Sequence, residues 1–93
     1  MSDSIVTMIG DKVVLDTATT IVYIGTLASV TDHTFVLDDA DMHDCRDGHA
    51  TKEVYVSQTT RALEGKVAVN RRRVVVMRSA VISLSRLTDV VQE

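Results

Sequence analysis

The strongest concentration of basic side chains is at Arg71 to Arg73, with Lys66 and Arg78 close by along the chain. Guanidinium groups bind phosphate oxygens through paired N–H donors, and aromatic or imidazole rings stack on unpaired bases. His33 and Tyr55 are rings that could supply such stacking. These residue types therefore indicate a surface able to hold a phosphate-containing chain.

The same arginines also have a purely structural interpretation. Alternate arginines on an exposed strand can pair with aspartates of a neighbouring strand or subunit, and Asp38, Asp39 and Asp41 are candidates. Charged side chains also protect a strand edge from unwanted pairing. Because the formal net charge is −3, the composition favours this interpretation over general binding of polyanions.

An acidic segment carries side chains that are able to bind a metal ion. Its candidates, all within seven positions, are His43, Asp44, Cys45, Asp47 and His49. A thiolate with two imidazoles would suit zinc, but the spacing matches no established zinc motif. Asp39-x-Asp41 lacks the rest of an EF-hand loop. We therefore predict a solvated acidic loop, with no metal and no cofactor.

Cys45, the only cysteine, is the candidate for a nucleophile. A reactive thiol needs a base and electropositive surroundings, whereas aspartates surround this one. No glycine-rich phosphate loop or nucleophile elbow is present elsewhere, so we predict no enzymatic activity. A single cysteine cannot form an internal disulfide, and no apolar run approaches the ~18 residues of a membrane span. A cytoplasmic location is expected.

The chain has 93 residues, which is enough for one domain with a modest core. Hydrophobic residues make up 45% of it, but there are only two Tyr, one Phe and no Trp. The core must therefore rest on Val, Ile and Leu, which favour strands. In so small a protein exposed strand edges matter, so self-association or a partner is expected.

The stretch 19–40, TTIVYIGTLASVTDHTFVLDDA, predicts a long bent strand, a tight turn and a second strand at 33–38. Its apolar residues occur at both parities, as in a barrel strand with two buried faces. Gly25 marks a bend or bulge where the sheet curls. Further strands are predicted at 12–16, 66–77 and 80–85. Residues 1–9 are left open between helix, strand and tail, and residues 86–93 are predicted to pack over a barrel end.

Residues 51–65 are ambiguous. Val54 to Val56 has strand propensity, whereas Thr51 could cap a helix and Gly65 could end one. We favour a helix over 51–64. Its predicted buried face comprises Tyr55, Gln58 or Thr59, Ala62 and Leu63, while Lys52 and Arg61 are predicted to face water.

Two segments resemble the sequence motifs of the Sm-like (LSm) family. IVYIGTLASV followed by FVLDDA is similar to the first Sm motif, with its bent strand, its glycine and its trailing L-x-D-A end. VVVMRSAVISLS is similar to the second motif, in which a hydrophobic strand is followed by Arg-Gly and a final strand. The resemblance spans Gly10 to Ser85. It implies a divergent member with a mainly β fold: a small, strongly bent five-stranded Sm-like (SH3-like) open barrel with a helical insertion around 51–64.

The resemblance also implies a role and an assembly. Sm-like proteins pair the fourth strand of one subunit with the fifth of the next, and most form rings that bind single-stranded RNA near the pore. Carried over by position, the RNA-binding residues are His33 and Thr34 from the turn and Arg78 from the link. Thr34 stands where the family has Asn, and Ser79 stands where it has Gly.

The sequence thus predicts a non-enzymatic, homo-oligomeric Sm-like module that binds single-stranded RNA weakly. The alternative is an oligomeric protein-interaction scaffold that has lost RNA binding. The domain is predicted over 10–87, with an insertion at 39–66, a lead-in at 1–9 and a tail at 88–93. The predicted RNA-binding residues are His33, Thr34, Arg71, Arg72, Arg73 and Arg78. The predicted interface residues are Val74, Val76, Val81 and Ser83.

Overall fold

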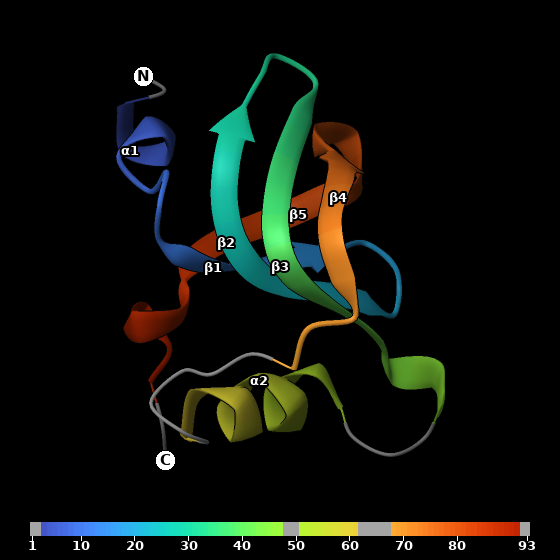
Figure 1. Ribbon diagram of the computed structural model, residues 1–93. Coiled ribbons are helices and arrows are strands. Elements are labelled where there is room, and N and C mark those ends of the chain that lie inside the picture. Colours follow the sequence, from blue (N-terminus) through green and yellow to red (C-terminus); the bar gives the residue numbers. More distant parts are fainter. Residues whose placement is uncertain (1–2, 48–50, 62–67, 92–93) are drawn as a thin grey trace.

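A five-stranded antiparallel sheet dominates the computed structural model, which describes residues 3–47, 51–61 and 68–91 (Figure 1). The strands lie in the order β4-β3-β2-β1-β5. The helices are α1 (Asp3–Val6) and α2 (Lys52–Arg61). The strands are β1 (Lys12–Thr17), β2 (Ile21–Val30), β3 (Thr34–Asp44), β4 (Arg71–Met77) and β5 (Val81–Arg86). Short 3-10 turns are η1 (Cys45–Asp47), η3 (Arg78–Ala80) and η4 (Leu87–Asp89). The predicted five strands and helical insertion are confirmed.

The sheet bends sharply where β2 passes β3, so that β1 and β5 run across the other three strands (Figure 1). The β2–β3 register shifts between Ile24 and Thr26, on either side of Gly25. A Cβ on Gly25 would lie 2.8 Å from the Cβ of Ala40. Opposite, Asp39 adopts a positive φ of 50°, which marks a bulge. The predicted bend at Gly25 is therefore present, and it depends on the missing side chain.

Two apolar clusters occupy the two sides of the bent sheet. The first lies inside the barrel and includes Leu15, Leu27 and Leu37. The second, which includes Val22 and Ile24, lies on the opposite face of β1 and β2, where α2 and η4 cover it. Burial on both sides explains why both faces of β2 are apolar. One face of β2 lines the barrel, and the other is buried by segments that follow later in the chain.

The lead-in forms a short helix, which resolves the alternative left open by the sequence. Ile5 and Met8 pack against the first cluster. Gly10 has φ of +97°, a conformation that glycine adopts without steric cost, and it turns the chain into β1. Within the described residues, no helix is long and apolar enough to cross a membrane.

The prediction of a solvated loop after Asp38 was wrong, because β3 continues through the acidic residues to Asp44. Their carboxylates have partners on neighbouring elements. Asp38 pairs with Arg73 on β4, and Asp44 accepts from Thr20 at 2.7 Å and pairs with Arg46 at 2.6 Å. Because each of these partners lies beside the strand, acidic residues can occupy it without an unpaired buried charge.

Two details of the insertion also differ from the prediction. Lys52 does not face water: its ammonium group donates to Asp16 Oδ1 at 2.5 Å and to the carbonyl oxygens of Thr17 and Thr19. The fourth strand begins at Arg71, and residues 68–69 are not part of it. The side chains of Gln58 and Arg61, and residues 62–67, lie outside the described part of the chain.

The end of the chain packs as predicted for its first residues only. Leu87 is buried in the second cluster and Val90 packs against it. Val91, the next apolar residue, is 82% exposed. The segment forms a single 3-10 turn at Leu87–Asp89, and Val91 lies beyond this turn and outside the cluster.

Candidate nucleic-acid interface

The turn between β2 and β3 is held by the hydroxyl group of Thr31. Its Oγ1 accepts hydrogen bonds from the backbone N–H groups of His33 and Thr34, at 3.2 and 3.0 Å, and it lies 2.7 Å from the hydroxyl of Thr34. The backbone N–H of Thr31 donates to the carbonyl of Thr34 at 2.9 Å. This arrangement fixes the turn and leaves the His33 side chain exposed.

Arg78 lies against this turn although it is 47 positions from Thr31. Its backbone N–H donates to the carbonyl of His33 at 2.8 Å, and its Nη1 donates to the carbonyl of Thr31 at 2.8 Å. The guanidinium carbon lies 5.0 Å from the centroid of the Phe35 ring, within the range of a cation–π contact. The structure thus brings together three of the predicted residues, His33, Thr34 and Arg78.

Two residues of this site were not predicted from the sequence. Phe35 is buried in the core, and its ring also supports the guanidinium of Arg78. Thr31 was passed over because its role depends on a carbonyl that becomes an acceptor only once Arg78 is beside it. The spacing T-x-x-T was the available signal, since a threonine hydroxyl often caps the two following N–H groups.

A cavity of about 360 Å³ adjoins the same site. Arg78 and Phe35 form part of its wall, with Ile5 and Met8 on the N-terminal side and Val81 to Leu84 on β5. The lining is mainly apolar, with the guanidinium group as its charged component. This cavity could not be predicted from sequence alone, because its walls come from three distant parts of the chain.

The arginine cluster divides into residues with different partners. Arg73 donates two hydrogen bonds to the carboxylate of Asp38, at 2.6 and 2.9 Å. The hydrogen bond from Arg73 lowers the pKa of Asp38 below its ordinary value. Arg71 donates to the carbonyl of Asn70, and among the described residues neither Arg71 nor Arg72 makes an ion pair. The structural interpretation therefore holds for one arginine of the three.

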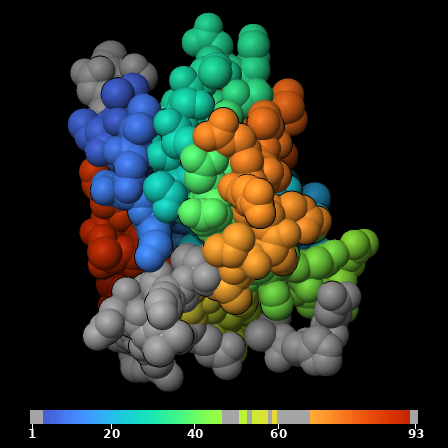
Figure 2. Space-filling view, in the orientation of Figure 1, coloured from blue at the N-terminus to red at the C-terminus, as the bar shows by residue number. Residues whose placement is uncertain are grey.

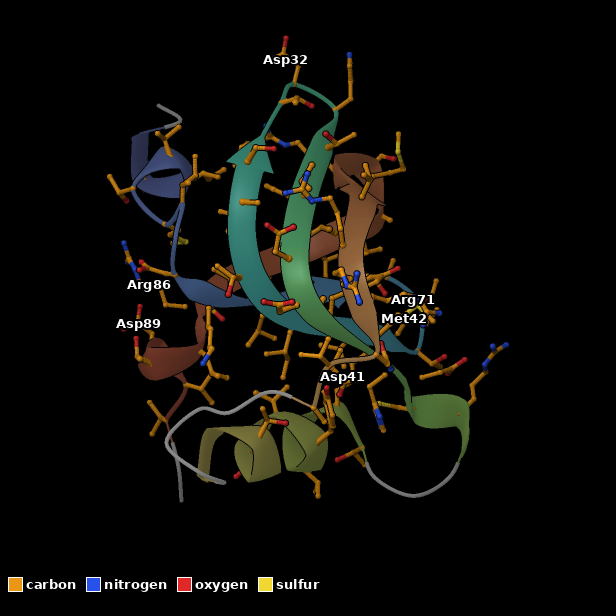
Figure 3. All side chains as sticks on the ribbon, viewed as in Figure 1. Asp32, Asp41, Met42, Arg71, Arg86 and Asp89 are labelled. Carbon is orange, nitrogen blue, oxygen red and sulfur yellow. The ribbon has the colours of Figure 1, made fainter. Side chains whose placement is uncertain are left out.

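The structure does not bring this cluster to Arg78. Arg71 and Arg78 lie at opposite ends of the seven-residue strand β4. At about 3.3 Å per residue, they are separated by roughly 20 Å. Figure 3 shows Arg71 at the end of β4 nearest α2, while the turn with Asp32 is at the far end of the sheet.

The predicted interface residues differ in accessibility. Val76 is only 3% exposed and belongs to the first cluster, against which Val74 and Val81 pack. Ser83 is exposed. Three other apolar residues of these strands are exposed: Val75 is 56%, Met77 53% and Ile82 65% exposed. Parity alone could not distinguish the two faces of VVVM, since both are apolar.

The described residues of the acidic segment are involved in local contacts. Burial raises the pKa of the Cys45 thiol, which lowers the fraction of nucleophilic thiolate. His43 stacks on the ring of Tyr55, with centroids 4.0 Å apart. In the part of the chain that the structure describes, no three histidine, cysteine or acidic side chains group as metal ligands. His49 lies outside that part.

Comparison with known proteins identifies the fold. No family model and no curated protein matches the chain. Among solved structures, it is similar to the Sm protein of Pyrococcus abyssii, which was solved in complex with a uridine heptamer. The TM-score is 0.61 and the identity 19%, over 90% of this chain and 93% of that one. The predicted Sm-like architecture is therefore confirmed: this chain has the fold of Sm proteins, in a divergent sequence.

Proposed function

We propose that this chain is a non-enzymatic, self-associating Sm-like module that binds single-stranded RNA weakly at the turn 31–34 and Arg78. The observation that carries the proposal is the position of Arg78, held against the turn by two hydrogen bonds and by Phe35. A guanidinium group fixed in this way loses little conformational freedom when it contacts a phosphate or a base. The similar Sm protein that holds a uridine heptamer supports this choice of ligand.

The neighbouring side chains suit an unpaired nucleotide of low affinity. The exposed imidazole of His33 can stack on a base. The hydroxyl of Thr34 can contact a base edge, but it lies 2.7 Å from that of Thr31, so part of its hydrogen-bonding capacity is already used. An amide at this position could both donate and accept, whereas a shared hydroxyl does less. Weak binding follows from this difference.

Arg71 and Arg72 are the further candidates for phosphate contacts. Both are exposed at the start of β4 and have no acidic partner among the described residues. Because they lie roughly 20 Å from Arg78, they would contact a different part of the same strand. Arg73 contributes less, since Asp38 already neutralises its charge.

Self-association is supported by the two outer strands. Within the described residues, β4 pairs only with β3, and β5 pairs only with β1. In Figure 2, β4 lies at the surface beside β3. Each of these strands presents apolar side chains to solvent, namely Val75 and Met77 on β4 and Ile82 on β5. Two unlike open edges on one chain allow head-to-tail pairing between copies, which can close into a ring.

The decisive experiment combines native mass with RNA binding. The purified protein is weighed by native mass spectrometry before and after nuclease treatment, and the binding of short U-rich and A-rich RNA is measured at two salt concentrations. We expect a multiple of the subunit mass and binding that weakens steeply with salt. Binding that is undetectable, or independent of salt, would overturn the RNA proposal, and a monomer would overturn self-association.

One set of observations favours the alternative of a protein-interaction scaffold. Arg73 forms an ion pair with Asp38, and the hydroxyl of Thr34 shares a hydrogen bond with that of Thr31. The formal net charge is −3. If the chain is a scaffold, reversing Arg71, Arg72 and Arg73 to glutamate disrupts the oligomer, and no RNA of either class binds to the unaltered protein.

A further inference from the structure

One aromatic side chain of α2 both packs on the sheet and hydrogen-bonds to it. Tyr55 of α2 is 9% exposed and its ring lies on that of His43, with an angle of 5° between the planes. Its hydroxyl donates a hydrogen bond to Oδ2 of Asp41 on β3. Burial, together with this hydrogen bond, raises the pKa of Tyr55, so the hydroxyl stays protonated and remains a donor.

Asp41 extends this contact to the next strand. Its second oxygen, Oδ1, accepts a hydrogen bond from Nδ2 of Asn70 at 2.8 Å. Asn70 directly precedes Arg71, the first residue of β4. A single carboxylate therefore connects α2 to the point at which the outer strand begins. Figure 3 shows Asp41 beside α2, with Met42 of β3 and Arg71, the first residue of β4, close by.

The side chain of Asn70 takes the place of a backbone rung in the sheet. Its Oδ1 accepts from the N–H of Met42 at 3.0 Å, and its Nδ2 donates to the carbonyl of Met42 at 3.1 Å. The backbone N–H of Asn70 donates to the carbonyl of Ala40 at 2.9 Å. The β3–β4 ladder is thereby continued past Arg71, by an amide whose orientation depends on Asp41.

We propose that Tyr55 is a positioning residue that couples the docking of α2 to the register of β4, through Asp41 and the amide of Asn70. Since β4 carries one of the two open edges, this coupling makes the insertion a regulator of self-association, and that part of the inference rests on the proposed function. When α2 is docked, the start of β4 is held beside β3. When Tyr55 is released, Asp41 and Asn70 lose their common orientation and the first rung of the outer strand opens.

A second attachment of α2 provides a matched control. Lys52 donates to Asp16 Oδ1 and to the carbonyl oxygens of Thr17 and Thr19. None of these acceptors belongs to the Tyr55–Asp41–Asn70 chain of hydrogen bonds. Removing the ammonium group therefore removes one attachment of α2 and leaves the hydrogen bonds of Tyr55, Asp41 and Asn70 in place. Cys45, which packs against the same cluster as Tyr55, reports on docking through the reactivity of its thiol.

The test compares Tyr55→Phe, Asn70→Ala and Lys52→Met with the unaltered protein. Three quantities are measured: the thiol reactivity of Cys45, the hydrogen exchange of the Met42 and Asn70 backbone amides by NMR, and the native mass. We expect Tyr55→Phe to raise thiol reactivity and to speed exchange at both amides by about tenfold, as for loss of one hydrogen bond to a charged group. Asn70→Ala, which removes the same link directly, should also speed exchange at both amides, with unchanged thiol reactivity.

Lys52→Met tests whether faster exchange at the start of β4 is specific to the loss of the Tyr55 hydrogen bond. We expect it to leave exchange at Met42 and Asn70 within twofold of the unaltered protein, because the hydrogen bonds of Tyr55, Asp41 and Asn70 remain. Thiol reactivity does not report docking in this variant, because the ammonium group of Lys52 itself lowers the pKa of Cys45. Equal acceleration by Lys52→Met and Tyr55→Phe would overturn the inference, as would unchanged exchange in Tyr55→Phe.

The native mass tests whether the Tyr55 contact affects self-association. If the unaltered protein is oligomeric, Tyr55→Phe should increase dissociation into subunits by about tenfold. An unchanged distribution would overturn the regulatory role. A monomeric unaltered protein would overturn the proposed self-association, and with it this role, whereas the exchange data would still decide the coupling within the chain.

Discussion

The backbone N–H of Arg78 donates to the carbonyl oxygen of His33 at 2.8 Å, which joins the link before the last strand to the turn before the third. Two segments that are far apart in sequence thus form one surface. The guanidinium of Arg78 also caps the carbonyl of Thr31, so its position is set by the backbone of the turn. Any RNA contact made here depends on both segments at once.

Replacing Arg78 by alanine should weaken the binding of a short U-rich RNA by about tenfold or more, as for loss of one base or phosphate contact. Fluorescence anisotropy at low salt measures the affinity for the RNA. Arg46→Ala is the control, because that arginine is exposed and pairs with Asp44, away from the turn. Equal weakening by both variants would point to overall charge as the cause.

Arg71→Ala and Arg72→Ala should each lower the salt dependence of RNA binding, by roughly 0.7 in the slope of log K against log salt. Arg73→Ala is the matched control in the same strand, since Asp38 already holds that guanidinium. It should change the slope much less. A slope that falls by the same amount in all three variants would contradict the division of the cluster.

Lysine at Val75 should reduce the oligomer mass, because it places a charge beside the open edge of β4, where Val75 is 56% exposed. Val54→Lys provides a control at a valine that is 46% exposed on α2. Native mass spectrometry at matched concentrations compares them. An oligomer that survives Val75→Lys would argue against β4 as an assembly edge.

Alanine at Gly25 should destabilise the fold by about 1–3 kcal/mol, the usual cost of overpacking a core. Its Cβ would lie 2.8 Å from the Cβ of Ala40 and 2.9 Å from the Cα. Adding Ala40→Gly should restore part of the loss, because only the first of these contacts disappears. Urea unfolding of the unaltered protein and of the two variants measures the effect. Full stability of Gly25→Ala would show that the bend does not require glycine.

The ion pair of Asp38 should make stability depend on acid pH. Because Arg73 holds the folded-state pKa of Asp38 below its ordinary 3.8, the pair stabilises the folded protein above pH 3.8 and the contribution is lost as the pH falls through the lowered value. Asp38→Asn should therefore be less stable than the unaltered protein at pH 7, by an amount that shrinks toward pH 3. A gap that is equal at both pH values would contradict this reasoning.

Local sequence determined the backbone plan of this protein. Alternating and double-sided apolar runs predicted the strands, and Gly25 predicted the bend, because strand periodicity and the absence of a side chain act over a few neighbouring residues. Thr51 and the residues after it predicted α2 for the same reason, since capping is a local interaction. The turn and the link were recognisable as motifs, so His33, Thr34 and Arg78 could be named before their contacts were known.

Tertiary structure alone decided how the charged residues are used. Nothing in RRR distinguishes Arg73 from its neighbours; the β3–β4 register does, because it sets Asp38 opposite Arg73. Pairing with β2 carries β3 through the acidic residues to Asp44, and the position of α2 beside the sheet brings Tyr55, Asp41 and Asn70 together. Such pairings join residues that are far apart along the chain. Their contribution to the free energy of folding depends on distances that are set only when the strands and α2 have packed together.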